Sequence, residues 1–286
     1  MKIKNILSKK RTLSFEIFPP KKEGEFESLV MTISQLRKYQ PDWISVTYGA
    51  GGSTKEKSVD VASVVKTFFN TEVLAHLTCV NSKREEIKEI LNELKRRGIE
   101  NILALRGDPP IGNRFEPGQS DFNYASDLVS FVRKNNGFCI GGACYPQGHL
   151  ESLSLDEDIE NLKKKVDAGT DFLITQLFFE NSKFYDFVEK AKKAGINIPI
   201  IPGIMPITNY HQIRRMTELS GQEIPKVLKD RLESVADQPE EVEKRGRNYA
   251  ATQVADLINN GVAGVHFYCM NKSKIVSNIL DWIGYK

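Results

Sequence analysis

The sequence has few cysteines and histidines, and neither kind of residue is spaced as a metal site or a disulfide framework requires. The four cysteines lie in or beside apolar segments and form no C-x-x-C pair: Cys79, Cys139, Cys144 and Cys269. This pattern predicts reduced, buried thiols. The histidines are scattered along the chain at positions 76, 149, 211 and 266. Their spacing argues against a metal-dependent enzyme, and we assign no metal ligands.

Long apolar runs and an excess of one charge are also absent. No apolar run approaches the roughly 20 residues that a membrane-spanning helix needs, and the apolar stretches within residues 1–18 are too short and interrupted for a signal peptide. The net charge is +3, and most of the 40 basic residues lie beside acidic ones, as in residues 83–97. This favours solvated helix faces over a nucleic-acid surface. We therefore expect a cytoplasmic protein with no membrane or nucleic-acid partner.

The size and composition suit one large α/β domain. The chain has 286 residues, of which 40% are hydrophobic and 27% are charged. Two small domains are the alternative, but no segment has the composition of an interdomain linker. Residues 217–240 contain additional polar and helical material, which we interpret as a rim insertion. The prediction is a single domain over residues 1–286.

Short apolar segments rich in Ile, Val, Phe and Thr alternate with helical patterns along the chain. Eight of them are too short for helices and are interpreted as buried parallel strands, at residues 12–17, 43–48, 73–79, 101–106, 138–144, 171–178, 198–202 and 263–269. Ser-x-x-Glu pairs predict capped helix starts, at Ser53–Glu56, Ser82–Glu85 and Ser154–Glu157. The alternation predicts a (β/α)8 barrel of the TIM type, with an open doubly wound sheet as the alternative.

Most of these strands end in a polar side chain just before a turn. In a parallel barrel the carboxyl ends of all strands share one rim. Side chains far apart in sequence are therefore expected to converge on one pocket: Glu16, Thr47, His76, Arg106, Asp108, Tyr145, Gln176 and Tyr268. The strand segments contain no lysine, which argues against a Schiff-base lyase or aldolase.

Ten motifs in order, spanning nearly the whole chain, make it similar to methylenetetrahydrofolate reductase, a flavoprotein that makes 5-methyltetrahydrofolate. They are FEIFPPK (15–21), SVTYGAGGST (45–54), AHLTC (75–79), LALRGDPP (103–110), YASDLV (124–129), YP-x-x-H (145–149), NLKKKVDAG (161–169), TQLFF (175–179), IIPGIMP (200–206) and HFY (266–268). The resemblance implies a (β/α)8 barrel, bound FAD, NADH or NADPH as electron donor, a folate substrate and a homo-oligomer. It covers the catalytic domain alone, so inhibition by S-adenosylmethionine through a regulatory domain is not expected.

The resemblance also implies catalytic roles for two carboxylates. Glu16 matches the family's catalytic glutamate. Glu16 lies between the apolar residues Phe15 and Ile17, so desolvation would favour its protonated form. In that form it could protonate N10 of the folate as the five-membered ring of the substrate opens. Asp108 matches a residue that binds folate and tunes the flavin. Without the family, a local Arg106–Asp108 ion pair is an equally good interpretation.

Further positions are assigned to ligand binding by the same resemblance. The folate-contacting positions are Gln176, Gln212, Tyr268 and Lys272. The FAD-contacting positions are Thr47, His76, Arg106, Gly107, Asp108, Tyr124, Ala125, Tyr145, His149, Asp158, Asn161 and Lys165. Arg106 suits a pyrophosphate because its guanidinium is a planar donor fork. The loop at residues 49–52 could approach a phosphate, although it is neither a G-x-G-x-x-G loop nor a P-loop.

Two positions depart from the family pattern. Met216 stands where the family has an aromatic residue against the nicotinamide or folate, and Lys272 stands where we expect an arginine. No Rossmann-type ribose-reading motif is present, so the choice between NADH and NADPH stays open. A barrel that binds folate or flavin without turnover is the non-enzyme alternative. The presence of Glu16, Asp108 and Gln176 argues against it.

Overall fold

The computed structural model describes residues 1–22, 24–48, 52–108, 118, 120–135 and 137–285, and for residues 52–56 it describes the backbone alone. Within this part of the chain one parallel sheet contains all the strands. They are β1 (Thr12–Ile17), β2 (Trp43–Val46), β3 (Glu72–Thr78), β4 (Asn101–Leu105), β5 (Cys139–Cys144), β6 (Phe172–Thr175), β7 (Ile200–Ile201), β8 (Gly203–Ile204) and β9 (Gly264–Tyr268). The strand order is β7-β6-β5-β4-β3-β2-β1-β9-β8.

The ring closes through a strand that is interrupted at Pro202. β7 pairs with β6, and β8 pairs with β9, so the two ends of the sheet are adjacent in sequence. Proline has no amide to donate to a ladder, which explains the interruption. The strand predicted at 198–202 contains β7, and the second piece, β8, lies just beyond the predicted end. The carbonyl oxygen of Pro202 still accepts a hydrogen bond from the His266 amide (3.0 Å). The predicted (β/α)8 barrel is confirmed.

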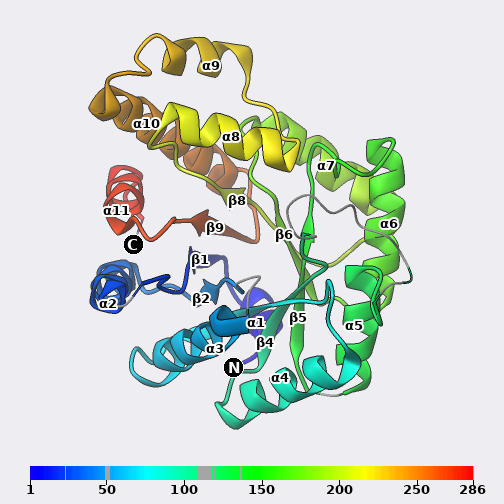
Figure 1. Cartoon of the computed structure of the whole chain (residues 1–286). Helices are drawn as coiled ribbons and strands as arrows, with labels where there is room; N and C mark the ends of the chain where they lie inside the picture. Colours follow the sequence, from blue (N-terminus) through cyan, green and yellow to red (C-terminus); the bar gives the residue numbers. More distant parts are fainter. Residues whose placement is uncertain (23, 49–51, 109–117, 119, 136, 286) are drawn as a thin grey trace.

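Helices surround the ring of strands (Figure 1). They are α1 (Ile3–Leu7), α2 (Glu25–Leu36), the 3-10 helix η1 (Arg37–Tyr39), α3 (Gly52–Thr67), α4 (Arg84–Arg96), α5 (Ala125–Lys134), α6 (Leu155–Asp167), α7 (Asn181–Lys193), α8 (Tyr210–Ser220), α9 (Lys226–Glu233), α10 (Pro239–Asn259) and α11 (Ser273–Trp282). Three helices, α8 to α10, lie between β8 and β9. The segment 217–240 spans the end of α8, all of α9 and the start of α10, and its identity as an insertion stays a prediction.

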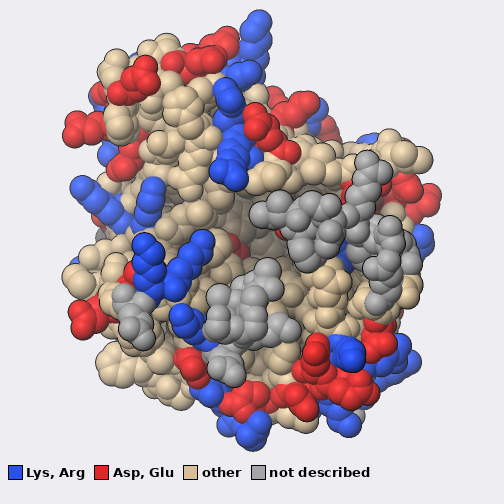
Figure 2. Space-filling model, viewed as in Figure 1, with Lys and Arg blue, Asp and Glu red and all other residues tan. Residues whose placement is uncertain are grey.

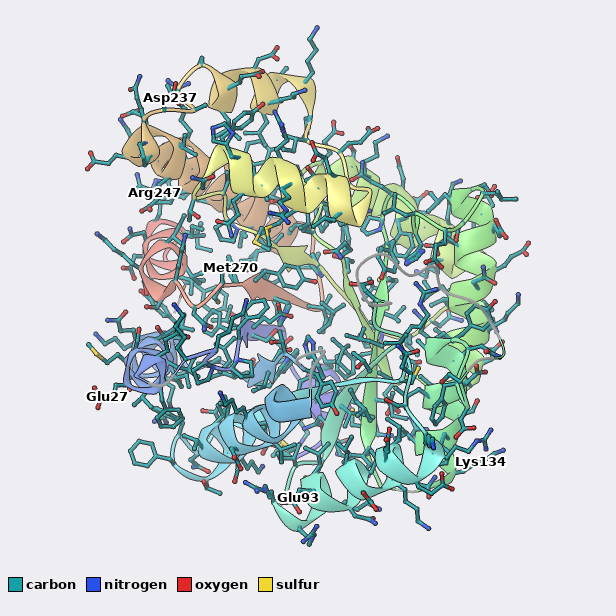
Figure 3. The ribbon with its side chains drawn as sticks, in the orientation of Figure 1. Glu27, Glu93, Lys134, Asp237, Arg247 and Met270 are labelled. Carbon is teal, nitrogen blue, oxygen red and sulfur yellow. The ribbon has the colours of Figure 1, made fainter. Side chains whose placement is uncertain are left out.

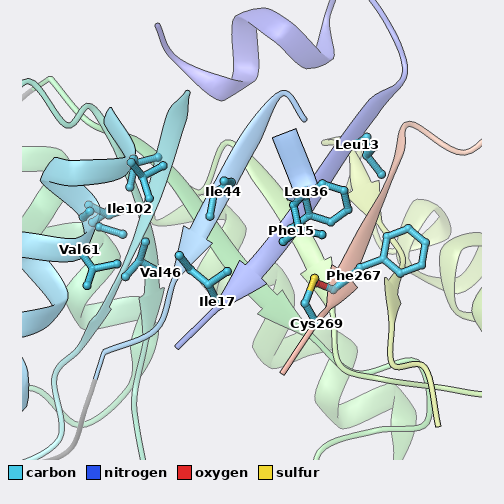
Figure 4. Packing of buried hydrophobic residues seen from close by; sticks show 14 of the residues in the cluster. Leu13, Phe15, Ile17, Leu36, Ile44, Val46, Val61, Ile102, Phe267 and Cys269 are labelled. Carbon is cyan, nitrogen blue, oxygen red and sulfur yellow. The ribbon is translucent and has the colours of Figure 1, made fainter. Parts of the chain in front are cut away.

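Strand β1 shows how the sequence separates the core from the barrel interior. Leu13, Phe15 and Ile17 are buried in the main hydrophobic cluster outside the ring, where they pack with helix residues such as Leu36 (Figure 4). Because side chains alternate along a strand, Ser14 and Glu16 point to the opposite face. The alternation therefore places Glu16 inside the barrel.

The amino-terminal end of the barrel is filled. Helix α1 inserts Ile3 into a buried cluster that also contains Trp43, Leu74, Leu103 and Phe172. The amide of Ile3 donates to Oδ1 of Asn101 (2.8 Å), a side chain that is fully buried. A packed lower interior leaves the carboxyl ends of the strands as the place for a cavity.

The outer surface carries the charges. Glu27, Glu93 and Lys134 lie on outer helices, whereas Met270 lies inside, near α8 (Figure 3).

All four cysteines are buried and free, as the sequence predicts. No helix in the described residues has both the length and the apolar character needed to span a membrane.

Candidate active site

A cavity of about 620 Å³ lies at the carboxyl ends of the strands. Many of the predicted site residues line it: Glu16, Thr47, His76, Arg106, Gly107, Asp108, Tyr145, His149, Gln176 and Tyr268. Figure 2 shows this face of the molecule hollowed, with Lys and Arg side chains to the left of the hollow and above it. The structure therefore brings together residues that are separated by up to most of the chain length, as the barrel prediction requires.

Glu16 and His76 form a neutral pair at the base of the cavity. Glu16 is 8% exposed, and burial raises its pKa to about 8. Burial lowers the pKa of His76 to about 3. Oε2 of Glu16 lies 3.5 Å from Nε2 of His76. Because desolvation disfavours both charged forms, near neutral pH this is a carboxylic acid beside a neutral imidazole.

Two buried serine hydroxyls below the cavity each bond a histidine: His76, which lines the cavity, and His266, which does not. Ser45 Oγ lies 2.5 Å from His76 Nε2, and Ser14 Oγ lies 2.8 Å from His266 Nδ1. Sequence analysis did not identify Ser14 or Ser45. The alternation along β1 and β2 could have found them, because an inward serine precedes Glu16 by two residues and Thr47 by two residues.

Tyr268 closes the cavity on the side of β9. Its hydroxyl donates to the carbonyl oxygen of Thr175 (2.5 Å). Burial, together with the nearby Glu16, holds the pKa of Tyr268 well above its usual value of 10. Tyr268 is therefore a neutral hydrogen-bonding group whose position is fixed by β6.

Arg106 forms a bidentate ion pair with Glu151. Its Nη1 and Nη2 atoms lie 2.5 and 2.7 Å from the two carboxylate oxygens. The hydrogen bonds between the two side chains lower the pKa of Glu151 and raise the pKa of Arg106. Glu151 was not identified from the sequence, because it lies 45 residues away in a loop and matches no motif. The local pairing of Arg106 with Asp108 was the alternative from sequence; after the larger effect of Glu151, the charge of Asp108 also contributes to the raised pKa of Arg106.

The Glu151 loop also holds two predicted cofactor residues. The Glu151 amide donates to Nδ1 of His149 (3.1 Å), and the ring of His149 meets Tyr145 edge-on with centroids 4.7 Å apart. Burial raises the pKa of Tyr145 to about 12. These contacts fix two aromatic rings at the rim.

One wall of the cavity is rich in methionine. Met205, Met216 and Met270 line it together with Leu177 and Leu219. Methionine is flexible and polarizable, so this wall can pack against flat rings of different shape. Met216, the departure from the family's aromatic residue, is part of this wall.

Two predicted cofactor residues lie directly behind the cavity wall. Lys165 Nζ donates to the carbonyl oxygen of Ala143 (2.7 Å), and Ala143 lines the cavity. The buried Asp158 accepts from Ser152 Oγ (3.3 Å). Burial raises the pKa of Asp158 and lowers that of Lys165. Asn161, on the same helix, is exposed and accepts from Lys164 Nζ (2.9 Å).

The remaining predicted residues lie outside the cavity lining. Tyr124 and Ala125 are at the start of α5. Gln212 lines a small crevice with Met205, Met216 and Met270, beside the cavity. Lys272 Nζ donates to Thr208 Oγ1 (3.1 Å). Binding roles for all these residues stay predictions.

The glycine loop at 49–51 falls outside the described residues. In the part of the chain that the structure does describe, no group of three or more His, Cys, Asp and Glu side chains is placed to hold a metal.

Two solved structures share the fold. A Clostridium thermocellum protein described as uncharacterized, which binds two copies of 5-methyl-5,6,7,8-tetrahydrofolic acid, superposes with a TM-score of 0.64 at 14% identity over 100% of both chains. Oxaloacetate acetylhydrolase gives a TM-score of 0.54 at 12% identity over 98% of this chain and 83% of its own. At these identities the similarity shows the fold alone.

Sequence relatives extend along nearly the whole chain. Methylenetetrahydrofolate reductase 1 of Schizosaccharomyces pombe is 41% identical over 278 residues, 96% of this chain and 46% of the yeast protein. Methylenetetrahydrofolate reductase (NADH) 1 of Arabidopsis thaliana is 38% identical over 296 residues, which are 99% of this chain and 50% of the plant protein. The chain therefore spans about half the length of these relatives.

The bacterial relatives are closer in length. The 5,10-methylenetetrahydrofolate reductase of Escherichia coli is 34% identical over 274 residues, 96% of this chain and 91% of the bacterial protein. The family model for methylenetetrahydrofolate reductase matches residues 2–284. This chain belongs to the methylenetetrahydrofolate reductase family.

Proposed function

We propose that this chain reduces 5,10-methylenetetrahydrofolate to 5-methyltetrahydrofolate, with FAD as its cofactor and NADH or NADPH as the electron donor. The observation that carries the proposal is the buried carboxylic acid of Glu16, with a pKa of about 8, inside a cavity that also presents Asp108 and Gln176. Family membership supplies the substrate class. The plant relatives are named for NADH, which favours NADH as the donor to test first.

The cavity residues fit a flavin dinucleotide. A volume of about 620 Å³ lies within the usual range for cofactor and ligand sites. Leu103, Leu105 and Met205 supply apolar walls for a flat ring, and Arg106 presents a guanidinium at the same cavity, which suits phosphate. The cofactor would be held by four residues that line the cavity, Thr47, His76, Tyr145 and His149. The residues assigned to FAD that lie behind or beside the cavity wall would complete its binding site. A flavin bound here would supply the hydride-transfer chemistry between the nicotinamide and the folate.

Glu16 supplies the proton that opens the substrate ring. As the bond between N10 and the bridging methylene breaks, N10 keeps the electron pair and takes the proton of Glu16. The methylene remains on N5 as an iminium, which accepts hydride and becomes the methyl group. Glu16 is left as a carboxylate and regains a proton from solvent. A raised pKa suits this role because the acid is protonated before the reaction near neutral pH.

Gln176 and Asp108 orient the substrate in this proposal. The Leu177 amide donates to Oε1 of Gln176 (2.8 Å), so the amide NH2 is the part of the side chain that can donate to a ligand. Asp108 is exposed at the cavity and can accept from N–H groups of a pterin. Together they offer the donor and the acceptor that a pterin edge needs.

We infer a ping-pong order for the two substrates. In this proposal the donor and the folate bind in turn at the same face of the flavin, so the oxidised donor leaves before the folate enters. We also propose that the protein forms a homo-oligomer and is located in the cytoplasm.

The test is steady-state kinetics on the purified protein with its flavin content measured. With NADH and methylenetetrahydrofolate both varied, we expect 5-methyltetrahydrofolate as product and parallel double-reciprocal lines. Absence of folate-dependent donor oxidation with both NADH and NADPH would contradict the activity. Intersecting lines would contradict the ping-pong order alone.

A further inference from the structure

Three polar side chains from neighbouring strands meet beneath the cavity. Glu16 on β1 lies opposite Ser45 on β2 in the sheet register. His76 on β3 directs Nε2 toward both, at 2.5 Å from Ser45 Oγ and 3.5 Å from Glu16 Oε2. Ser45 is completely buried and, unlike Glu16 and His76, is not among the residues that line the cavity. Its contact is with the imidazole rather than with a ligand.

The position of the proton on His76 decides how the ring affects Glu16. A neutral imidazole carries one N–H, on either Nδ1 or Nε2. If Nε2 carried it, the ring could donate to the Glu16 carboxylate, and that charge-assisted bond would favour the ionised acid. If Nδ1 carries it, Nε2 is an acceptor for the Ser45 hydroxyl. The Ser45 hydroxyl is fully buried and has no other hydrogen-bond partner among the described residues, so its proton is satisfied only if it donates to Nε2. This favours the second arrangement.

We propose that Ser45 is a positioning residue whose hydroxyl donates to Nε2 of His76, which fixes the imidazole as the Nδ1–H form and keeps it from stabilising the Glu16 carboxylate. This inference rests on the proposed function, in which Glu16 acts as the acid. Ser45 thereby helps to keep Glu16 protonated at the pH where the reaction runs.

The other groups facing Glu16 do not take this role. His266 and Tyr268 lie on β9, and Cys269 follows it directly. Burial keeps these three neutral, because it lowers the pKa of His266 to about 3 and raises those of Tyr268 and Cys269. Tyr145 follows β5, and its pKa is raised to about 12 by burial. Arg106 and Asp108 follow β4 and line the cavity, where Arg106 is paired with Glu151.

The first test compares two variants of the flavin-loaded enzyme that each lose one buried hydroxyl. Ser45→Ala frees Nε2 to carry a proton and donate to Glu16. The pH above which folate reduction is lost should therefore fall by about one unit. Thr71→Val is the control, because it deletes a buried hydroxyl that bonds the Phe69 carbonyl oxygen before β3, outside the cavity lining. It should leave that pH in place. An unchanged profile in Ser45→Ala, or an equal shift in both variants, would overturn the inference.

The second test needs no turnover and uses the wild-type protein. Nitrogen-15 NMR of labelled histidine, with the His76 resonances assigned by a His76→Gln variant, reports which ring nitrogen carries the proton. We expect Nδ1–H in the wild type and Nε2–H in Ser45→Ala. Nε2–H in the wild type would overturn the inference even if the protein reduces folate. A wild type that shows Nδ1–H but reduces no folate would instead refute the proposed function.

Discussion

At the residue scale, Glu16 is both buried and part of a ligand cavity. It is 8% exposed, and no cation in the described residues compensates it, since its imidazole neighbour is neutral. Burial therefore raises its pKa instead of producing an ion pair. An acid of this kind is useful for proton donation and unfavourable for stability, a combination typical of functional sites.

Glu16→Gln should separate the two half-reactions. Glutamine keeps the size of the side chain but has no proton to give, so folate reduction should fall by about 100-fold or more. Flavin binding and flavin reduction by NADH should be retained. In the wild type, the rate of the folate half-reaction should fall as pH rises through about 8, because the acid is then ionised. Rapid-mixing kinetics of each half-reaction check this, and normal folate turnover in the variant would remove Glu16 from the mechanism.

The same substitution should change stability in a pH-dependent way. Between pH 4.5, the ordinary pKa, and about 8, folded Glu16 keeps a proton that the unfolded chain has lost, so this group lowers stability as pH rises. Glutamine does not titrate. The melting temperature of Glu16→Gln relative to wild type should thus increase from pH 5 to pH 8.5. A difference that is equal at both pH values would contradict the raised pKa.

Asp108→Asn should raise the midpoint potential of the bound flavin and weaken folate binding. A negative charge at the cavity opposes the addition of electrons to the flavin, and asparagine removes that charge. Asp186→Asn, at an exposed position on α7 outside the cavity, is the control. Spectroelectrochemical titration measures the potential, and a midpoint equal to wild type would count against the electrostatic role.

Some of the site follows from sequence at this scale and some does not. The apolar neighbours of Glu16 predicted its desolvation, which the structure confirms. The alternation along β2 marks Ser45 as inward-facing, but its contact with His76 depends on how β2 pairs with β3. The contact of Glu151 with Arg106 depends on a loop conformation, which no local pattern encodes.

At the element scale, the ring depends on how the interrupted strand β7–β8 closes. Gly203, the first residue of β8, donates its amide to Thr175 Oγ1 (2.9 Å). A Cβ there would lie 2.5 Å from the Thr175 carbonyl oxygen and 2.6 Å from the Tyr268 ring. The closing strand therefore requires glycine for close approach.

Gly203→Ala should destabilise the protein by about 1–3 kcal/mol and displace Tyr268 from the cavity wall. Folate affinity should fall as well. Gly98→Ala is the comparison, because a Cβ there meets nothing within 4 Å and the cost is that of its left-handed backbone, φ +70°. That variant should lose stability alone. Chemical denaturation and folate titration distinguish the two, and unchanged folate affinity in Gly203→Ala would contradict the coupling.

Element positions were largely predictable, and their ends were less so. The Ser154 cap is present, since Ser154 Oγ accepts from the Glu157 amide (3.1 Å). The cap predicted at Ser82–Glu85 is shifted by one residue, because Glu86 accepts from the amide of Lys83 instead. The side chains of the Ser53–Glu56 pair lie outside the described residues. At residues 83–86, Lys-Arg-Glu-Glu, either glutamate could cap the start of the helix, and the sequence alone does not choose between them.

At the scale of the whole molecule, the barrel gives each end a different task. The amino-terminal end is packed by α1 and a buried apolar cluster, and the carboxyl end carries the cavity. Alternation of short apolar segments with helical patterns predicted the strands and helices but left an open doubly wound sheet as the alternative, and the family resemblance favoured the closed barrel. The split of one strand at Pro202 and the location of Asp158 and Lys165 behind the wall, instead of on it, required the three-dimensional structure.

The most direct test of the central claim is the absorbance of one anaerobic sample through both half-reactions. If the chain is a flavin-dependent reductase, the purified protein shows a flavin spectrum that NADH or NADPH bleaches. Addition of methylenetetrahydrofolate should then restore the oxidised spectrum. A protein that binds no flavin, or a bleached flavin that methylenetetrahydrofolate leaves unchanged, would contradict it.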